Sequence, residues 1–160
     1  MKNRDMKEVE KFKQRNKIRT FGKNVPNPVE TFDETQLPKY VLDVIKSLNY
    51  TKPTPIQSQC KSFITLGWPV ALLGRDLVGI AETGSGKTLG YAIPAIIHIN
   101  GQRLVERGEG PIVLVMVPTR ELAMQIQKEC QRFATACQLT VAAVYGGSDR
   151  ATQHLTLQRG

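Results

Sequence analysis

The octapeptide AETGSGKT, residues 81–88, constrains the fold of this chain more than any other stretch. It stands between the apolar run DLVGI and the helical pattern LGYAIPAII. A glycine-rich loop between a buried strand and a helix gathers backbone N–H groups and the positive end of the helix dipole at one point, which binds phosphate. Gly84 and Gly86 would let the backbone wrap around the oxygens, Lys87 would reach the outer phosphates, and the Thr88 hydroxyl would hold Mg²⁺. The general pattern begins with glycine, where this chain has Ala81, so a simple glycine-rich turn is the alternative.

Apolar patterns around this loop predict alternating strands and helices. Continuous β-branched and aliphatic runs are typical of buried parallel strands, and we expect strands at 75–81, 111–117 and 139–147. Apolar residues at steps of three and four predict helices, which we place at 37–50, 53–66, 86–100, 118–137 and 148–160. Strands that alternate with helices imply an α/β fold, with a parallel sheet and helices on both faces.

Positive charge is concentrated near the N-terminus. The net charge is +8, and residues 1–24 hold nine Lys or Arg against three acids, which leaves 13 basic and 11 acidic residues in the rest. Short basic segments low in apolar residues are typical of solvated arms. We expect a basic, flexible arm over 1–24 that is either simply solvated or bound to nucleic-acid phosphates. The folded domain would then span 25–160.

Cysteine usage and hydropathy indicate an intracellular protein. Cys60, Cys130 and Cys137 are an odd set without metal-ligand spacing, so we expect reduced, mostly buried thiols. No apolar run approaches the ~20 residues that a membrane helix needs. The N-terminus also lacks the apolar stretch of a secretory signal.

Four short motifs follow one another in the order KPTPIQ, AETGSGKT, PTRELA and YGG. Together they resemble the N-terminal RecA-like domain of DEAD-box ATP-dependent RNA helicases, a family whose phosphate loop begins with alanine. The resemblance covers about residues 20–160 and implies a partial RecA-like P-loop domain, with a Q motif at 32–57, the P-loop at 81–88, PTRELA at 118–123 and a glycine pair at 146–147. The segments VPNPVETFDE, GWPVAL and PAIIHIN resemble the nuclear members that act in RNA processing, which implies a nuclear location.

The resemblance implies an ATP site. Gln57 would read the adenine edge with its amide, which offers both a donor and an acceptor. Phe32 lies 17 residues before Asn49, the spacing at which an isolated aromatic residue of the family stacks on adenine. Without the resemblance, a core anchor is the preferred interpretation of Phe32. Lys87 and Thr88 are the implied catalytic residues, and Thr88 is the implied ligand of Mg²⁺. The other implied nucleotide-binding residues are Tyr50, Thr51, Lys52, Ala81, Glu82, Thr83, Gly84, Ser85 and Gly86.

The same resemblance implies a surface for RNA. Pro118, Thr119 and Arg120, at the start of a helix, would contact RNA phosphates, and Gly146 and Gly147 would let the RNA backbone approach closely. Phosphate and sugar contacts carry no base sequence, so we expect binding with little sequence preference. The alternative for Arg120 is an ion pair with Glu121 or another neighbouring acid.

The chain also departs from the pattern of the family. It ends at Gly160 and contains no DEAD stretch, no Ser-Ala-Thr motif and no second RecA-like domain. We expect that it neither unwinds RNA nor hydrolyses ATP appreciably by itself, because phosphoryl transfer depends on positioned charge. Glu82 stands where the family has glutamine. Residues 60–66, CKSFITL, look inserted, and seven residues lengthen a helix by about two turns with little change of face.

Three functions stay open on the sequence. The first is the ATP- and RNA-binding part of a DEAD-box RNA helicase. The second is an RNA- or partner-binding module without nucleotide function, which would act through the basic arm and the PTRELA surface. The third, an unrelated P-loop ATPase, would not need the PTRELA motif and is the least favoured.

Overall fold

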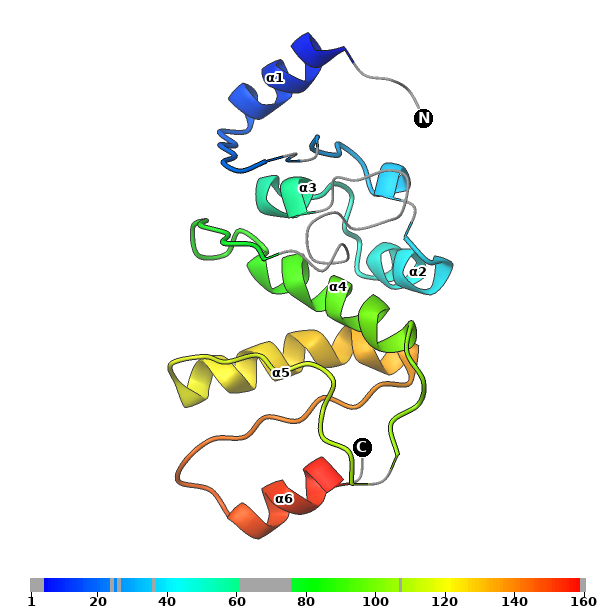
Figure 1. The fold of residues 1–160 in the computed structure, drawn as a ribbon, viewed down its shortest axis with the longest axis vertical. Coiled ribbons are helices and arrows are strands. Elements are labelled where there is room, and N and C mark those ends of the chain that lie inside the picture. The colour runs from blue at the N-terminus through cyan, green and yellow to red at the C-terminus, as the bar shows by residue number, and fades with distance from the viewer. Residues whose placement is uncertain are drawn as a thin grey trace. The chain divides into compact units, whose positions relative to one another are not determined.

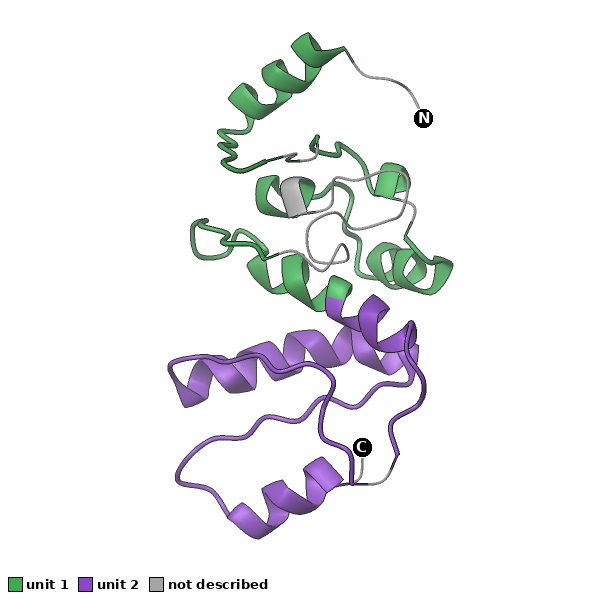
Figure 2. Cartoon of the chain, viewed as in Figure 1, with its two compact units in different colours: residues 1–94 green, residues 95–160 purple. Residues whose placement is uncertain are grey.

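The chain forms two compact units, residues Met1–Pro94 and Ala95–Gly160 (Figure 2). A computed structural model describes residues 5–23, 25, 27–35, 37–60, 76–106 and 108–158, except for the side chains of residues 59 and 60. Helices make up the regular structure of these ranges (Figure 1). The first unit contains α1 (Met6–Arg15), the 3-10 helix η1 (Asp33–Thr35), α2 (Lys39–Ser47), α3 (Pro55–Cys60) and the first part of α4 (Lys87–Asn100). The second unit contains the rest of α4, then α5 (Arg120–Ala134), the 3-10 helix η2 (Thr135–Cys137) and α6 (Arg150–Gln158).

Helix α1 lies within residues 1–24, the range in which the sequence predicts a basic, flexible arm. The Asp5 carboxylate caps the helix by accepting a hydrogen bond from the backbone N–H two residues on, at 3.2 Å. Glu8 lies in the first turn, and Lys13 and Arg15 lie in the last turn, the order that the helix dipole favours. Val9 is 1% exposed, so α1 has a buried side. A prediction based on net charge misses a helix of this kind, because one apolar position hardly changes the composition.

Helix α2 follows the predicted apolar spacing. Val41, Val44 and Ile45 are buried, as steps of three and one along a single helix face require. The next turn ends the helix: Asn49 adopts a left-handed conformation with φ 56°, and the N–H of Tyr50 donates to the carbonyl of Ile45 at 3.2 Å. The helix therefore occupies the centre of the predicted range 37–50.

An apolar core lies in the first unit. The N–H of Val29 donates to the carbonyl of Ser58 at 3.3 Å, which ties the extended segment before η1 to α3. Three residues of the first half of α4 are also buried. The buried apolar residues of this unit are Val9, Val29, Phe32, Leu37, Val41, Val44, Ile45, Leu89, Ala92 and Ile93.

Helices α5 and α6 form in the predicted places in the second unit. The hydroxyl of Thr119 caps α5 by accepting from the N–H of Leu122 at 3.3 Å. The carboxylate of Asp149 accepts from the N–H groups of Ala151 and Thr152, at 3.3 and 2.9 Å, at the start of α6. These bonds satisfy N–H groups that have no partner inside a helix.

The predicted strands are the part of the fold that the described residues do not form. Residues 76–80, 111–117 and 139–145 are drawn without arrows (Figure 1), and none of them belongs to a strand. Several apolar side chains in these segments face solvent, with Ile80 93% exposed and Met116 85% exposed. A strand exists only when its N–H and C=O groups bond to a neighbouring chain about 4.8 Å away. An apolar run shows that a segment is suited to a sheet, but the neighbouring strand to which it bonds is a different part of the chain.

Part of one prediction falls outside the described ranges. Helix α3 ends at Cys60, and residues 61–66 of the stretch that looks inserted lie outside the described residues, as does the rest of the range 61–75.

Ile45 and Ile80 provide a matched test of which segments are packed. Ile45→Ala removes a side chain that is 2% exposed, and we expect the free energy of unfolding to fall by about 2–4 kcal/mol. Ile80→Ala should change it by less than about 0.5 kcal/mol, because that side chain is solvated. Urea denaturation followed by circular dichroism measures both. Equal losses would contradict the structure, since they would show that Ile80 is packed in solution as in a paired strand.

Candidate nucleotide-binding site

Residues 81–86 form a turn that leads directly into α4. Gly84 and Gly86 adopt left-handed conformations, with φ 75° and 80°, which glycine takes at little cost. The N–H of Ser85 donates to the carbonyl of Glu82 at 3.3 Å. Lys87 is the first residue of α4, so the turn ends at the positive pole of a 14-residue helix. The loop-to-helix arrangement expected from the sequence is present.

The ammonium group of Lys87 lies across this turn. Its Nζ donates to the carbonyl of Ala81 at 2.5 Å and to the carbonyl of Glu82 at 2.6 Å. An ammonium has three donors, and here it gathers oxygens from the first two residues of the loop. The side chain of Glu82, which departs from the family pattern, is itself exposed.

Gln57 links α3 to the loop. It is 3% exposed, its Oε1 accepts from the N–H of Thr54 at 3.2 Å, and its Nε2 donates to the carbonyl of Gly86 at 3.1 Å. A Cβ placed on Gly86 would clash with this Nε2. The structure thus brings Gln57 against the turn at 81–86, and the recognition of an adenine edge by this residue stays a prediction.

Two buried hydroxyls near the loop have no hydrogen-bond partner among the described residues. They are Thr54 Oγ1 and Ser85 Oγ. Ser85 belongs to the loop, and Thr54 Oγ1 is 3.4 Å from the position of a Cβ on Gly86. A buried polar group without a partner costs free energy, and phosphate oxygens are acceptors for such hydroxyls. The donor set of the loop therefore fits a phosphate group.

Thr54 was missed in the sequence analysis as a site residue. It stands inside the motif KPTPIQ, three positions before Gln57. That spacing is about one helical turn, so Thr54, just before α3, and Gln57, in its first turn, lie near the same end of this helix. The motif was the available signal, but only the structure shows that the hydroxyl is buried.

The other implied nucleotide residues divide by their exposure. Phe32 is 8% exposed, which matches the core-anchor alternative, and its carbonyl accepts from the N–H of Thr35 at 3.0 Å. Residues 50–52 are exposed. Thr88 is half-buried in the first turn of α4, beside Lys87. The roles of Phe32 at adenine and of Thr88 at Mg²⁺ stay predictions.

Arg120 contacts the residue that precedes the glycine pair in the second unit. The guanidinium carbon of Arg120 lies 4.7 Å from the centroid of the Tyr145 ring, which is a cation–π contact. Tyr145 directly precedes Gly146 and Gly147. A Cβ on either glycine would meet nothing within 4 Å, so the surface beside them is open. Of the predicted RNA-contacting residues, Thr119 caps α5 and Pro118 lies just before it.

Side-chain hydrogen bonds hold the segment that carries Tyr145. Gln153 of α6 bonds to both backbone groups of Tyr145: its Oε1 accepts from the N–H at 2.9 Å and its Nε2 donates to the carbonyl at 3.1 Å. Gln127 of α5 donates to the carbonyl of Val141 at 3.1 Å. Hydrogen bonds from Thr152 and then Ala151 lower the pKa of the Asp149 carboxyl. None of these contacts is visible as a pattern in the sequence.

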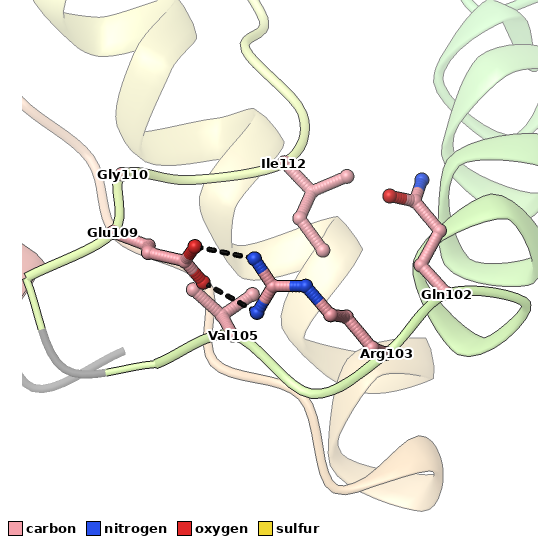
Figure 3. A pocket seen from close by; sticks show the side chains of 6 residues that line it. All are labelled: Gln102, Arg103, Val105, Glu109, Gly110 and Ile112. Atoms are coloured by element: carbon pink, nitrogen blue, oxygen red, sulfur yellow. Dashed lines mark hydrogen bonds and ion pairs between the residues drawn. The ribbon is translucent and has the colours of Figure 1, made fainter.

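A further pocket of about 230 Å³ lies in the loop after α4 (Figure 3). The side chains of Arg103 and Glu109 face each other across it and are joined by two hydrogen bonds, at 3.0 and 2.5 Å. This pairing, followed by a bond from the N–H of Glu106, lowers the pKa of Glu109. The pocket contains none of the residues predicted from the sequence. Its lining residues are Gln102, Arg103, Val105, Glu109, Gly110 and Ile112.

The described cysteines are free thiols. Cys130 and Cys137 are half-buried rather than fully buried, and burial raises the pKa of both thiols. Among the described residues, no group of three His, Cys, Asp or Glu side chains could hold a metal ion. Within the same ranges, no helix is both long and apolar enough to cross a membrane.

Comparisons with known proteins agree with the motifs. The family model of the DEAD/DEAH box helicases matches residues 54–160. The ATP-dependent RNA helicase dbp2 of Aspergillus clavatus is 54% identical over 157 residues, which are 98% of this chain and 27% of that protein. The protein of the same name from Neurospora crassa is 53% identical over 158 residues, again 27% of its length. The chain thus spans about a quarter of these relatives.

Solved structures agree as well. The RNA-helicase Prp28 from Chaetomium thermophilum, bound to ADP, matches with a TM-score of 0.85 and 34% identity over 98% of this chain and 37% of that one. The yeast DEAD-box splicing factor Prp28 matches with a TM-score of 0.83 and 29% identity over 99% of this chain and 37% of that one. These neighbours are RecA-like helicase domains, so the predicted partial RecA-like α/β class is confirmed, although the described residues form no strand.

Substitutions at the two loop glycines test the contact between the loop and Gln57. Gly86→Ala would place an alanine in a left-handed conformation, and its Cβ would clash with the Gln57 amide. We therefore expect the free energy of unfolding to fall by about 2–3 kcal/mol. Gly84→Ala has the same backbone strain in open space and should cost about 1 kcal/mol. Adding Gln57→Ala to Gly86→Ala should recover part of the difference. Equal costs for the two glycine variants in urea denaturation would rule out the close contact.

Proposed function

Because this chain belongs to the DEAD/DEAH box helicase family, we propose that it binds an adenine nucleotide with Mg²⁺ through its first unit and RNA through its second. The observation that supports the nucleotide site best is the pair of buried, unpartnered hydroxyls, Thr54 and Ser85, beside a turn that opens onto the start of α4. The structural relative Prp28 from Chaetomium thermophilum was solved bound to ADP. The two sites contribute to ATP-driven work on RNA, the activity for which the relatives are named.

Each residue of the loop has a defined task in this proposal. The backbone N–H groups between Thr83 and Thr88 donate to phosphate oxygens, together with the dipole of α4. Lys87 exchanges its two carbonyl contacts for phosphate oxygens, which carry full charge and therefore bind an ammonium more strongly. Mg²⁺, when bound with the nucleotide, would neutralise phosphate charge, and the hydroxyl of Thr88 would hold the ion.

The adenine end is proposed for the residues of the Q motif. Gln57 keeps unused capacity, because an amide has two N–H donors and two lone pairs and the structure gives one bond on each side. Phe32 would stack on adenine after a small shift from its buried position. The exposed residues 50–52 would line the same pocket.

The RNA surface is proposed for the start of α5 and the glycine pair. Thr119 and Arg120 present a capped helix start and an exposed guanidinium, the groups that bind phosphates without reading bases. Open space beside Gly146 and Gly147 leaves room for a nucleic-acid backbone. A nuclear location is proposed on the sequence resemblance, and the likeness to the yeast Prp28, a splicing factor, supports it.

Lys87→Ala tests the nucleotide site. Loss of a charge-assisted hydrogen bond should weaken the affinity for a fluorescent ADP by about 10- to 100-fold. Lys39→Ala removes the same charge from the exposed start of α2 and serves as the control, with unchanged affinity expected. Titration of both variants and the wild type at one salt concentration measures the difference. Equal affinities, or no binding by the wild type, would favour the module without nucleotide function.

Thr54→Val separates a binding role from a folding role. Valine has nearly the same shape and lacks the buried hydroxyl, so the free protein should become more stable by about 1 kcal/mol while its affinity for ADP falls. Urea denaturation and nucleotide titration measure the two effects. A gain in stability together with a loss of ADP affinity is expected only if the hydroxyl has no partner in the free protein and bonds to the nucleotide. A loss of stability on substitution would show that Thr54 already has a hydrogen-bond partner in solution.

A further inference from the structure

Tyr145, at the end of the segment 139–145, lies beside Arg120 of α5, the glycine pair and Gln153 of α6. Its ring lies under the Arg120 guanidinium at 4.7 Å. Gly146 and Gly147 follow at once and turn the chain, with φ 78° at Gly147. Gln153 then returns along α6 to bond with both backbone groups of Tyr145. One tyrosine therefore connects the candidate RNA-contacting arginine with the glycine pair.

The bonds from Gln153 fix the backbone of Tyr145. A residue whose N–H and C=O both bond to one rigid amide has little freedom in φ and ψ, as in a sheet ladder. The amide is itself placed by α6, whose start is held by the bonds from Ala151 and Thr152 to Asp149. The direction in which the Tyr145 ring leaves the backbone is therefore set by Gln153.

The ring in turn restricts Arg120. A guanidinium stacks on an aromatic ring through its flat face, while its five N–H donors lie in its plane and point outward. The stack therefore leaves the donors of Arg120 available for a phosphate group. An exposed arginine loses rotamer freedom on binding, and a side chain already held in place loses less.

We propose that Gln153 is a positioning residue for RNA, which acts through the Tyr145 ring to hold the Arg120 guanidinium ready for a backbone phosphate. This inference rests on the RNA surface proposed above. It adds a residue on α6 that does not touch RNA, and it predicts an effect that depends on Arg120.

Binding of a fluorescent single-stranded oligouridine to the full chain, measured by anisotropy over a range of salt concentrations, tests the proposal. Arg120→Ala should weaken binding and lower the slope of log K against log salt by about 0.7, the value for one phosphate contact on a single strand. Gln153→Ala should weaken binding by about 2- to 5-fold, in line with the loss of an exposed cation–π contact. The double variant with Gln153→Ala and Arg120→Ala should bind no more weakly than Arg120→Ala alone.

Gln127→Ala is the matched control. Gln127 also donates from a helix to a backbone carbonyl of the same segment, at Val141, four residues from Tyr145. It should leave RNA affinity unchanged if the effect of Gln153 passes through the ring. Tyr145→Leu removes the ring but keeps the backbone groups that bond to Gln153. It should weaken RNA binding as much as Gln153→Ala does.

The outcomes separate the inference from the proposed function. If Arg120→Ala binds RNA as well as the wild type does, both the RNA surface and the inference fail. If Arg120→Ala weakens binding but Gln153→Ala and Tyr145→Leu do not, only the inference fails. Equal effects of Gln153→Ala and Gln127→Ala, or additive effects of Gln153→Ala and Arg120→Ala, would assign Gln153 a general structural role and also overturn it.

Discussion

The backbone at Gly86 takes a left-handed turn, with φ 80°, immediately before α4 begins. This turn points the Gly86 carbonyl at the Gln57 amide and leaves no room for a Cβ between them. It also starts the helix at Lys87, whose ammonium can then reach back to the carbonyl of Ala81. The amide of the Q motif, the lysine of the loop and the pole of the helix come together because one residue lacks a side chain. The proposed phosphate site depends on that arrangement.

Local patterns accounted for helices α2, α4, α5 and α6 and for the turn at 81–86. The apolar steps in α2 and the Thr119 cap of α5 are interactions within a few residues, so the sequence displays them directly. The turn that leads into α4 was predictable for the same reason, since its glycines, its lysine and the following helix are contiguous. The family resemblance supplied the link between this loop and the distant Gln57, and the bond to Gly86 agrees with it.

Long-range contacts explain what the sequence did not show. The segments at 76–80, 111–117 and 139–145 have the composition of strands, but the described residues offer them no ladder of hydrogen bonds. The helix in the basic arm depends on the burial of Val9, a tertiary effect that charge counting ignores. The burial of the Thr54 hydroxyl and the two bonds from Gln153 to Tyr145 are likewise not visible in a sequence pattern, because burial and bonds between distant residues arise only in the folded chain.

The solvated aliphatic side chains at Val78, Ile80, Leu114 and Met116 bear on how copies of this chain behave together in solution. Exposed apolar runs of this kind attract one another when molecules collide. The net charge of +8 and the isoelectric point near 9.6 oppose such collisions at neutral pH. Added salt shortens the range of that repulsion, and a polyanion that binds the chain neutralises it. The tendency of this chain to aggregate should therefore depend on ionic strength as much as on the fold.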